Sequence, residues 1–272
     1  MNRATAAAKL NLSLVVGPAR PDGKHEVATV LQRLALCDRV RVEPAERLSV
    51  RGFAGDTLVT DALRLLAAEA GVAPAWEATI DKKLPVAAGL GGGSSDAATA
   101  LRLANDTLAE PLPPERLHAL AAGLGADVPF FLAQGPQLGT GDGSELAQLD
   151  LPQDYWVLLV LPEGATKPST ASVYAAFDAR GGAEGFDGRR EALTAALAGA
   201  GRARDLAALP RNDLAASPLA AELEQRGAFR ADVTGAGPAV YGLFLHRDAA
   251  VAARRALRGR GRTWLTVPAW YG

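Results

Sequence analysis

The sequence is poor in the residues that build disulfides and cysteine-based metal centres. Among 272 residues it has one cysteine, Cys37, and three histidines. A single cysteine cannot form a disulfide within the chain, nor can it supply a zinc site made of several cysteines. The composition therefore excludes small disulfide-bonded scaffolds and zinc-ribbon modules.

The sequence also lacks an excess of charge and a long apolar run. It contains 29 Lys and Arg against 30 Asp and Glu, so no basic excess attracts nucleic acid. No apolar stretch approaches the roughly 20 residues of a membrane span. The first eight residues do not have the pattern of a signal peptide. We therefore expect a cytoplasmic protein that binds neither nucleic acid nor a membrane.

What the sequence does contain is enough apolar material, 49%, for a substantial core. The second half predicts a strand, helices, two strands, a helix and a last strand, an order typical of a ferredoxin-like, split βαβ arrangement. The predicted ranges are 155–161, 170–179, 189–200, 218–226, 229–234, 239–245, 248–258 and 263–267. The first half mixes strands and helices without a βαβ rhythm. These patterns predict an α+β fold with one domain at 1–150 and a second at 151–272.

Residues 9–16 alternate between apolar and polar side chains, which predicts a strand. Leucines and Val16 occupy one face of this strand, and Lys9, Asn11 and Ser13 occupy the other. A lysine that enters an apolar strand is unusual. By itself it is read as a solvated side chain on a strand edge.

A glycine-rich loop is the most informative segment. Four of the five residues 89–93 are glycines, which are costly to order and are useful where the backbone must approach a ligand. Their N–H groups can converge on an anion, and a helix predicted to start at Ser94-Ser95-Asp96 adds its positive end. Neither G-x-x-x-x-G-K-[ST] nor G-x-G-x-x-G fits the loop. The segment predicts phosphate binding; the alternative is a flexible turn before a serine-capped helix.

The loop resembles the ATP loop of the GHMP kinases, the family of galactokinase, homoserine kinase, mevalonate kinase and phosphomevalonate kinase. The resemblance implies an ATP site made of Pro85, Val86, Ala87, Ala88, Gly89, Leu90, Gly91, Gly92, Gly93, Ser94 and Ser95. Further segments resemble this family in the right order, namely 8–12, 22–26, 124–131, 168–174 and 234–237. The triple glycine with two serines is typical of the branch that acts on 4-diphosphocytidyl-2-C-methyl-D-erythritol.

This resemblance implies a small-molecule kinase that uses ATP with Mg²⁺, in the non-mevalonate route to isoprenoid precursors. The acceptor is the 2-hydroxyl of the cytidyl diphosphate sugar alcohol, and transfer is direct, without a phosphoenzyme. The two-domain GHMP kinase fold is implied as well, with an N-terminal nucleotide-binding domain and a ferredoxin-like C-terminal domain. We expect a monomer or weak dimer. The sequence does not indicate which residues bind the metal ion.

Roles for single residues follow from the same resemblance. Asp127 matches the catalytic base, although the residues around it also suit a helix N-cap. Lys9 matches the cation that works with this base. Asn11, His25 and Tyr174 match substrate-binding positions, the last two against the cytidine. Without the resemblance His25 is read as structural, and Tyr174 as part of a helix core.

Two positions depart from the family pattern. The residue before the histidine of the substrate turn is usually tyrosine and here is Lys24, and a small hydroxyl residue of the 234–237 segment is replaced by Ala236. The first departure affects how cytosine is stacked, and the second affects contacts near the transferred phosphate. Three alternatives stay open. They are a GHMP kinase of the homoserine or mevalonate type, a non-catalytic nucleotide-binding protein, and an RNA-binding protein.

Overall fold

The computed structural model describes residues 2–53, 57–165 and 169–269. Pro168, the first residue of the resembling segment 168–174, lies outside this part of the chain. None of the helices described is long and apolar enough to span a bilayer.

The chain is divided into two compact units that are not continuous in sequence. The first unit comprises Met1–Ala8, Leu36–Val86 and Gly91–Gln134, and the second comprises Lys9–Ala35, Ala87–Leu90 and Gly135–Gly272. The segments 9–35 and 87–90, which the sequence placed with the N-terminal half, therefore group with the C-terminal half. The boundary near residue 150 stays a prediction.

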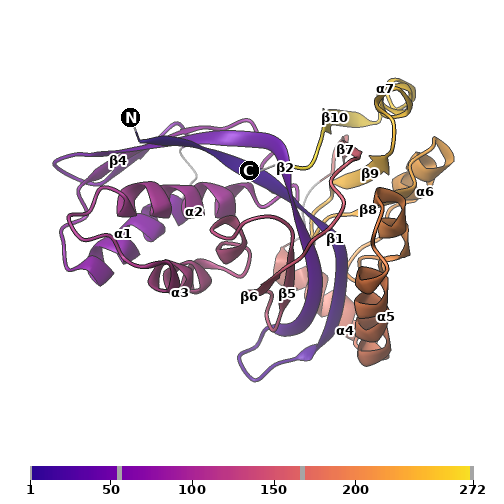
Figure 1. Ribbon diagram of the computed structural model, residues 1–272, viewed down its shortest axis with the longest axis horizontal. Helices are drawn as coiled ribbons and strands as arrows, with labels where there is room; N and C mark the ends of the chain where they lie inside the picture. Colours follow the sequence, from indigo (N-terminus) through magenta and orange to yellow (C-terminus); the bar gives the residue numbers. More distant parts are fainter. Residues whose placement is uncertain (1, 54–56, 166–168, 270–272) are drawn as a thin grey trace. The chain divides into compact units, whose positions relative to one another are not determined.

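The first unit is built on three helices that contact one another, α1, α2 and α3 (Figure 1). Their apolar faces form one core with alternate residues of β4, Trp76, Ala78 and Ile80. Part of β2 (His25–Pro44) pairs antiparallel with β4, and β3 runs parallel to β4. The elements are β3 (Ser49–Arg51), α1 (Leu58–Ala70), β4 (Trp76–Asp81), α2 (Gly92–Asn105), α3 (Pro114–Leu124) and the 3₁₀ helix η1 (Pro129–Phe131).

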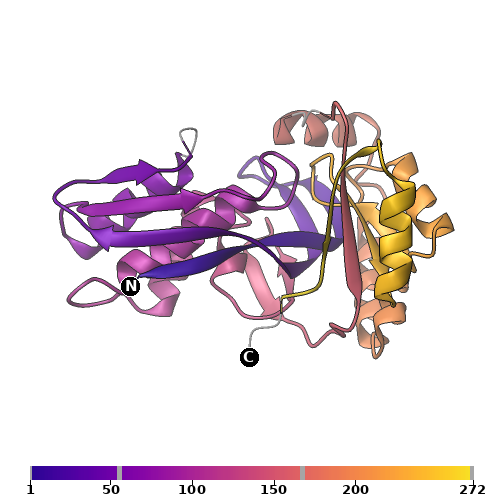
Figure 2. The same ribbon diagram turned by 90° about the horizontal axis from the view of Figure 1, so that it is seen from above.

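The second unit contains a four-stranded antiparallel sheet with the order β10-β7-β9-β8. Helices α6 and α7 contact these strands (Figure 2). The predicted ferredoxin-like order is confirmed, with ends within a few residues of those expected. The elements are β7 (Trp156–Pro162), α4 (Thr170–Ala179), α5 (Phe186–Ala198), the 3₁₀ helix η2 (Ala203–Ala208), α6 (Pro218–Gln225), β8 (Arg230–Val233), β9 (Val240–Phe244), α7 (Arg247–Ala256) and β10 (Gly261–Thr266).

Two long strands, β1 (Arg3–Ala19) and β2 (His25–Pro44), pair with each other, and β5 (Gln137–Thr140) and β6 (Glu145–Gln148) follow β2 in the pairing. The predicted strand at 9–16 is thus confirmed, but it is longer than its alternating segment. Its polar face is not exposed: Lys9, Asn11 and Ser13 are all buried. Thr29 of β2 and Thr234 of the loop after β8 hydrogen-bond to Asn11, so this residue has partners without water.

Candidate active site

Strand β1 places Lys9 and Asn11 side by side in the interior of the second unit. Lys9 is 3% exposed, and its ammonium Nζ donates a 2.7 Å hydrogen bond to Oδ1 of Asn11. The amide of Asn11 donates to Oγ1 of Thr29 on β2, which in turn donates to the carbonyl of Ser13. Lys9 is therefore not a solvated edge lysine. Buried polar groups in folded proteins are generally hydrogen-bonded, and the Lys9 ammonium follows this rule through Asn11.

The loop after β8, residues 234–237, lies directly against this pair. Oγ1 of Thr234 accepts a 3.1 Å hydrogen bond from the backbone N–H of Asn11. Gly235 has φ +58°, and a Cβ atom there would lie 3.3 Å from Oδ1 of Asn11 and 3.4 Å from Nζ of Lys9. The loop therefore sets the space around the lysine ammonium.

The first part of the glycine-rich loop, residues 87–90, packs on the same 234–237 loop. A Cβ atom on Gly89 would lie 2.4 Å from the carbonyl oxygen of Thr234, and one on Gly237 would lie 2.4 Å from the backbone of Ala88. The N–H of Lys9 donates to the carbonyl of Leu90 at 2.9 Å. Backbones approach this closely only where glycine is present, so the loop and β1 are fixed to each other.

The second part of the glycine-rich loop starts α2 in the first unit. The helix begins at Gly92, two residues before the predicted start, because Gly91 takes the N-cap position with φ +67°. Ser94 therefore lies at the third helical position, where a backbone N–H has no carbonyl of the same helix to bond and can attract an anion, whereas the N–H of Ser95 already donates to the carbonyl of Gly91 at 2.8 Å. Oγ of Ser95 is buried and has no hydrogen-bond partner among the described residues.

Just before the loop, Lys82 joins two fully buried carboxylates of the first unit. Its Nζ lies 2.8 Å from Oδ2 of Asp38 and 2.5 Å from Oδ2 of Asp96. Burial acts to lower the pKa of Lys82, but the hydrogen bonds to Asp38 and Asp96 outweigh it and raise this pKa. Asp38 also accepts from the N–H groups of Lys83 and Leu84. Sequence analysis missed this cluster, whose only signal was charge at the edges of apolar strands.

Asp127 lies in the turn between α3 and η1, half-buried, in the first unit. The N-cap position of η1 is Val128, and no side chain caps that helix. Asp127 directly precedes this position, and its role as base or as helix cap stays a prediction. Gly125 is the C-cap of α3.

His25 and Tyr174, the two residues expected against cytidine, are brought together in the second unit. Their ring centroids are 4.7 Å apart at an interplanar angle of 37°. Nε2 of His25 is 2.8 Å from Oδ1 of Asp178, one turn along α4 from Tyr174. Tyr174 is half-buried and also packs on the cluster around Leu14. It therefore contributes to the core while part of the residue stays exposed.

Lys24, at the position where the family usually has tyrosine, forms an ion pair with Asp142. Burial acts to raise the pKa of Asp142, but hydrogen bonds from Lys24 and Ser144 outweigh it and hold this pKa at about 2. The Lys24 ammonium therefore joins the turn before β2 to the turn between β5 and β6.

Ala236, the second departure, lines a cavity of about 530 Å³ between α4 and the segment 214–217. This volume is in the range of small-molecule pockets. In the described part of the chain, no group of three or more His, Cys, Asp or Glu side chains is arranged to hold a metal ion.

Comparison with known proteins gives the family. The model described as GHMP kinases N terminal domain matches residues 57–135, and the model described as GHMP kinases C terminal matches residues 215–263. The 4-diphosphocytidyl-2-C-methyl-D-erythritol kinase of Nocardia farcinica (strain IFM 10152) is 40% identical, over 94% of this chain and 89% of that protein. The enzyme of the same name from Geobacter sulfurreducens (strain ATCC 51573 / DSM 12127 / PCA) is 37% identical, over 94% of each chain.

Solved structures agree with the sequence relatives. A crystal structure of 4-(cytidine 5'-diphospho)-2C-methyl-D-erythritol kinase superimposes with a TM-score of 0.80 and 30% identity, covering 99% of this chain and 100% of the other. A homoserine kinase from Cytophaga hutchinsonii ATCC 33406 reaches a TM-score of 0.71 at 16% identity, over 98% of this chain and 94% of the other, and so shares the fold alone. The chain belongs to the GHMP kinase family.

Proposed function

We propose that this GHMP kinase transfers the γ-phosphoryl group of ATP to the 2-hydroxyl of 4-diphosphocytidyl-2-C-methyl-D-erythritol, a step towards isoprenoid precursors. The observation that carries this proposal is the match along nearly the whole chain to relatives named for that substrate. The pairing of His25 with Tyr174 supports it, because a small aliphatic alcohol needs no aromatic surface. Homoserine and mevalonate kinases resemble the chain in fold only.

Residues 85–95 are proposed to bind the triphosphate of ATP. The first N–H groups of a helix have no carbonyl of the same helix to bond, and these groups together with the positive end of α2, which begins at Gly92, suit an anion. Ala87 has φ +56°, a conformation that costs a residue other than glycine about 1–2 kcal/mol. Backbone strain of this kind collects at functional sites.

Asp127 is proposed as the base and Lys9 as the cation of the transfer. Asp127 takes the proton of the 2-hydroxyl, and this oxygen forms a bond to the γ-phosphorus. The bond between that phosphorus and the β,γ-bridging oxygen breaks, and ADP leaves with the electron pair. The Lys9 ammonium stabilises negative charge that develops during the transfer.

The substrate is proposed to be held by Asn11, His25 and Tyr174. A cytosine ring can stack on the aromatic surface that the last two residues form, and such stacking is worth about 1–3 kcal/mol per base. Asn11 already donates its amide to Thr29 and accepts from Lys9. We propose that Asn11 contacts the alcohol portion of the substrate, and that its bond to Lys9 keeps the ammonium in place.

Mg²⁺ is proposed to accompany ATP. Magnesium prefers oxygen ligands and usually binds through few protein groups together with substrate phosphates. The buried, unpaired Oγ of Ser95 is an oxygen donor of this kind at the start of α2. When bound, the ion neutralises charge on the phosphates.

The test is an ATP-consumption assay with the cytidyl substrate, homoserine and mevalonate as separate acceptors. We expect turnover with the first alone, with phosphorus NMR of the product showing a new monoester at the 2-position. Turnover with homoserine or mevalonate instead would assign the other branch of the family, and absence of turnover with all three would favour a non-catalytic nucleotide-binding protein. A cytoplasmic location, a monomer or weak dimer, and independence from nucleic acid and membranes stay predictions.

A further inference from the structure

Asn212 joins the backbone on both sides of Thr234 through one side chain. Its amide Nδ2 donates to the carbonyl of Val233 at 3.0 Å and to the carbonyl of Gly235 at 2.8 Å. Its Oδ1 accepts from the N–H of Leu214 at 2.8 Å. All three bonds are buried, so each group relies on this side chain rather than on water.

The carbonyl that Asn212 holds belongs to a residue that borders the candidate catalytic lysine. A Cβ atom on Gly235 would lie 3.4 Å from Nζ of Lys9 and 3.3 Å from Oδ1 of Asn11, so a small shift of this backbone would bring it against both groups. Since glycine has no side chain that could anchor it, the position of Gly235 depends on its backbone bonds. A displacement of residues 234–237 would therefore change the space around the Lys9 ammonium and the Asn11 amide.

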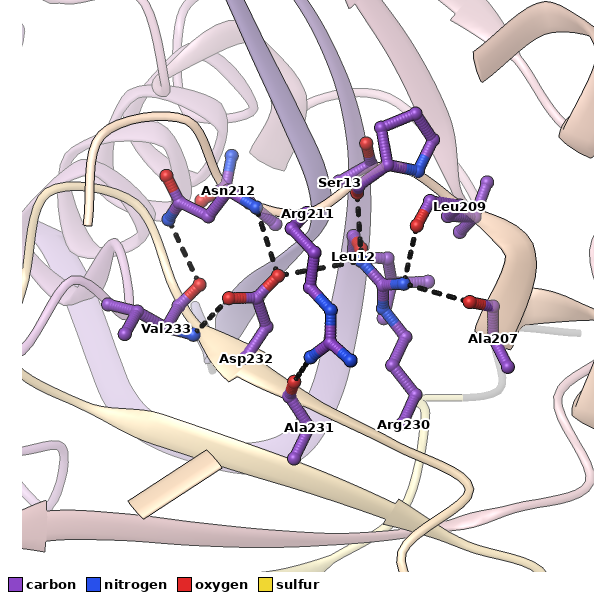
Figure 3. A network of polar contacts seen from close by, with 12 residues as sticks. Leu12, Ser13, Ala207, Leu209, Arg211, Asn212, Arg230, Ala231, Asp232 and Val233 are labelled. Atoms are coloured by element: carbon purple, nitrogen blue, oxygen red, sulfur yellow. Dashed lines mark hydrogen bonds and ion pairs between the residues drawn. The ribbon is translucent and has the colours of Figure 1, made fainter. Parts of the chain in front are cut away.

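Asn212 is itself held by a buried charged network (Figure 3). Its N–H donates to Oδ2 of Asp232 at 2.9 Å, and Asp232 lies 3.6 Å from the guanidinium of Arg230. Arg230 is 1% exposed and donates a 2.6 Å hydrogen bond to the carbonyl of Leu12, the residue after Asn11. One network thus fixes both β1 and the segment that carries Asn212.

We propose that Asn212 is a positioning residue for the phosphoryl transfer, which acts by holding Gly235 against Lys9 and Asn11. The proposal rests on the proposed function only in that it needs Lys9 to act in the transfer. It needs no particular acceptor alcohol. Catalysis is sensitive to placement, and a shift of about 1 Å can cost about 10²-fold in rate.

Asn105 offers a matched control. It is also a buried asparagine that braces a loop, with its amide donating to the carbonyl of Leu112 and its Oδ1 accepting from the N–H of the same residue. Replacing either asparagine by alanine removes similar side-chain bonds. If both act on stability alone, Asn105→Ala and Asn212→Ala should behave alike.

The experiment compares Asn212→Ala, Asn212→Asp and Asn105→Ala by steady-state kinetics and thermal melting. We expect both Asn212 variants to lose kcat by about 10- to 100-fold with KM for ATP little changed, and Asn105→Ala to keep its kcat at a comparable Tm. In a Lys9→Met background, Asn212→Ala should cost at most about two-fold, because the group that it positions is gone.

Two results would overturn the proposal. One is unchanged kcat in a folded Asn212 variant, and the other is an equal loss of kcat with and without Lys9. If Asn212→Ala does not fold, Asn212→Asp decides, since it keeps the shape; if neither folds, Asn212 holds the fold rather than the site and the proposal is wrong. Wild-type protein inactive on the cytidyl substrate would refute the proposed function alone, and the comparison would then use the acceptor that it phosphorylates.

Discussion

The backbones of Gly89 and Gly237 are in direct contact: a Cβ atom on Gly237 would lie 2.4 Å from the backbone nitrogen of Gly89. These two residues stand 148 positions apart in the sequence, one in the glycine-rich loop and one in the 234–237 segment. The two segments therefore fit closely against each other. We expect a substitution in either segment to weaken ATP binding.

Gly237→Ala should displace residues 87–90, because the clashing atoms are backbone and cannot rotate away. We expect a higher KM for ATP and a lower Tm. Gly188→Ala is the control: its Cβ meets nothing within 4 Å in α5, and alanine should stabilise the helix by about 0.5–1 kcal/mol. An unchanged KM for ATP in Gly237→Ala would show that the fit between the two loops does not matter for nucleotide binding.

Asp127→Asn should lower turnover by roughly 10²–10⁴-fold, the range for a lost general base, with ATP affinity nearly unchanged. Steady-state kinetics measure the loss of turnover, and calorimetry measures the affinity for ATP separately. Asp150→Asn, at an exposed carboxylate, should change neither. Near-normal turnover of Asp127→Asn would remove this residue from the chemistry.

Lys9→Met keeps the side-chain length and removes the buried charge. If the ammonium stabilises the transition state, kcat and kcat/KM should fall together. Lys83→Met, at a half-exposed lysine, should leave both constants unchanged. A rise in KM alone would make Lys9 a binding residue and would also weaken the role inferred for Asn212.

Tyr174→Ala should raise KM for the cytidyl substrate by about 5- to 100-fold, which corresponds to the loss of one stacked base. Turnover at saturation should stay near normal, because a ring far from the reacting hydroxyl binds ground and transition states alike. Tyr174→Phe keeps the ring and should retain most of the affinity. If KM does not respond to Tyr174→Ala, the aromatic pair with His25 is structural.

The Lys24–Asp142 pair should make stability depend on pH in the acid range. The pKa of Asp142 is held at about 2 in the folded protein against an ordinary 3.8, so its contribution is full above pH 4 and is lost as pH falls through 2. The side chain of Lys24 is 52% exposed, and screening limits the contribution to about 1 kcal/mol. Wild type should therefore melt a few degrees above Asp142→Asn at pH 6. The two should coincide near pH 2, and a gap that persists there would mean that another interaction was lost.

Local pattern predicted the second half of the fold well. Its strands and helices are short, and turn residues such as Gly235 and Pro238 separate them, so each element could be recognised from neighbouring residues. The ends were less certain: the helix predicted from 189 begins at Phe186, whose ring is buried. The glycine-rich loop stood out because glycines are costly to order and are useful where the backbone approaches a ligand, and its binding of phosphate stays a prediction.

What the sequence could not show depends on distant partners. Alternation in β1 correctly predicted a strand but suggested a solvated polar face, and only the contacts with Thr29 and Thr234 explain why that face is buried. Lys82 pairs with Asp38, 44 positions earlier, and Arg230 donates to the carbonyl of Leu12, 218 positions earlier. The periodicity of apolar residues does not indicate such pairings. It also does not indicate that residues 87–90 group with the C-terminal half.

The bonds that secure β1 also have a consequence for the order in which the protein matures. Lys9 and Asn11 leave the ribosome long before their partners, because Asn11 is bonded to Thr234, 223 positions later, and Leu12 to Arg230, 218 positions later. Contacts of such large sequence separation form slowly, and these contacts cannot form until residues 230–234 have been synthesised. A nascent chain that stops before residue 230 should therefore be unable to arrange its lysine and asparagine, whatever else in it has folded.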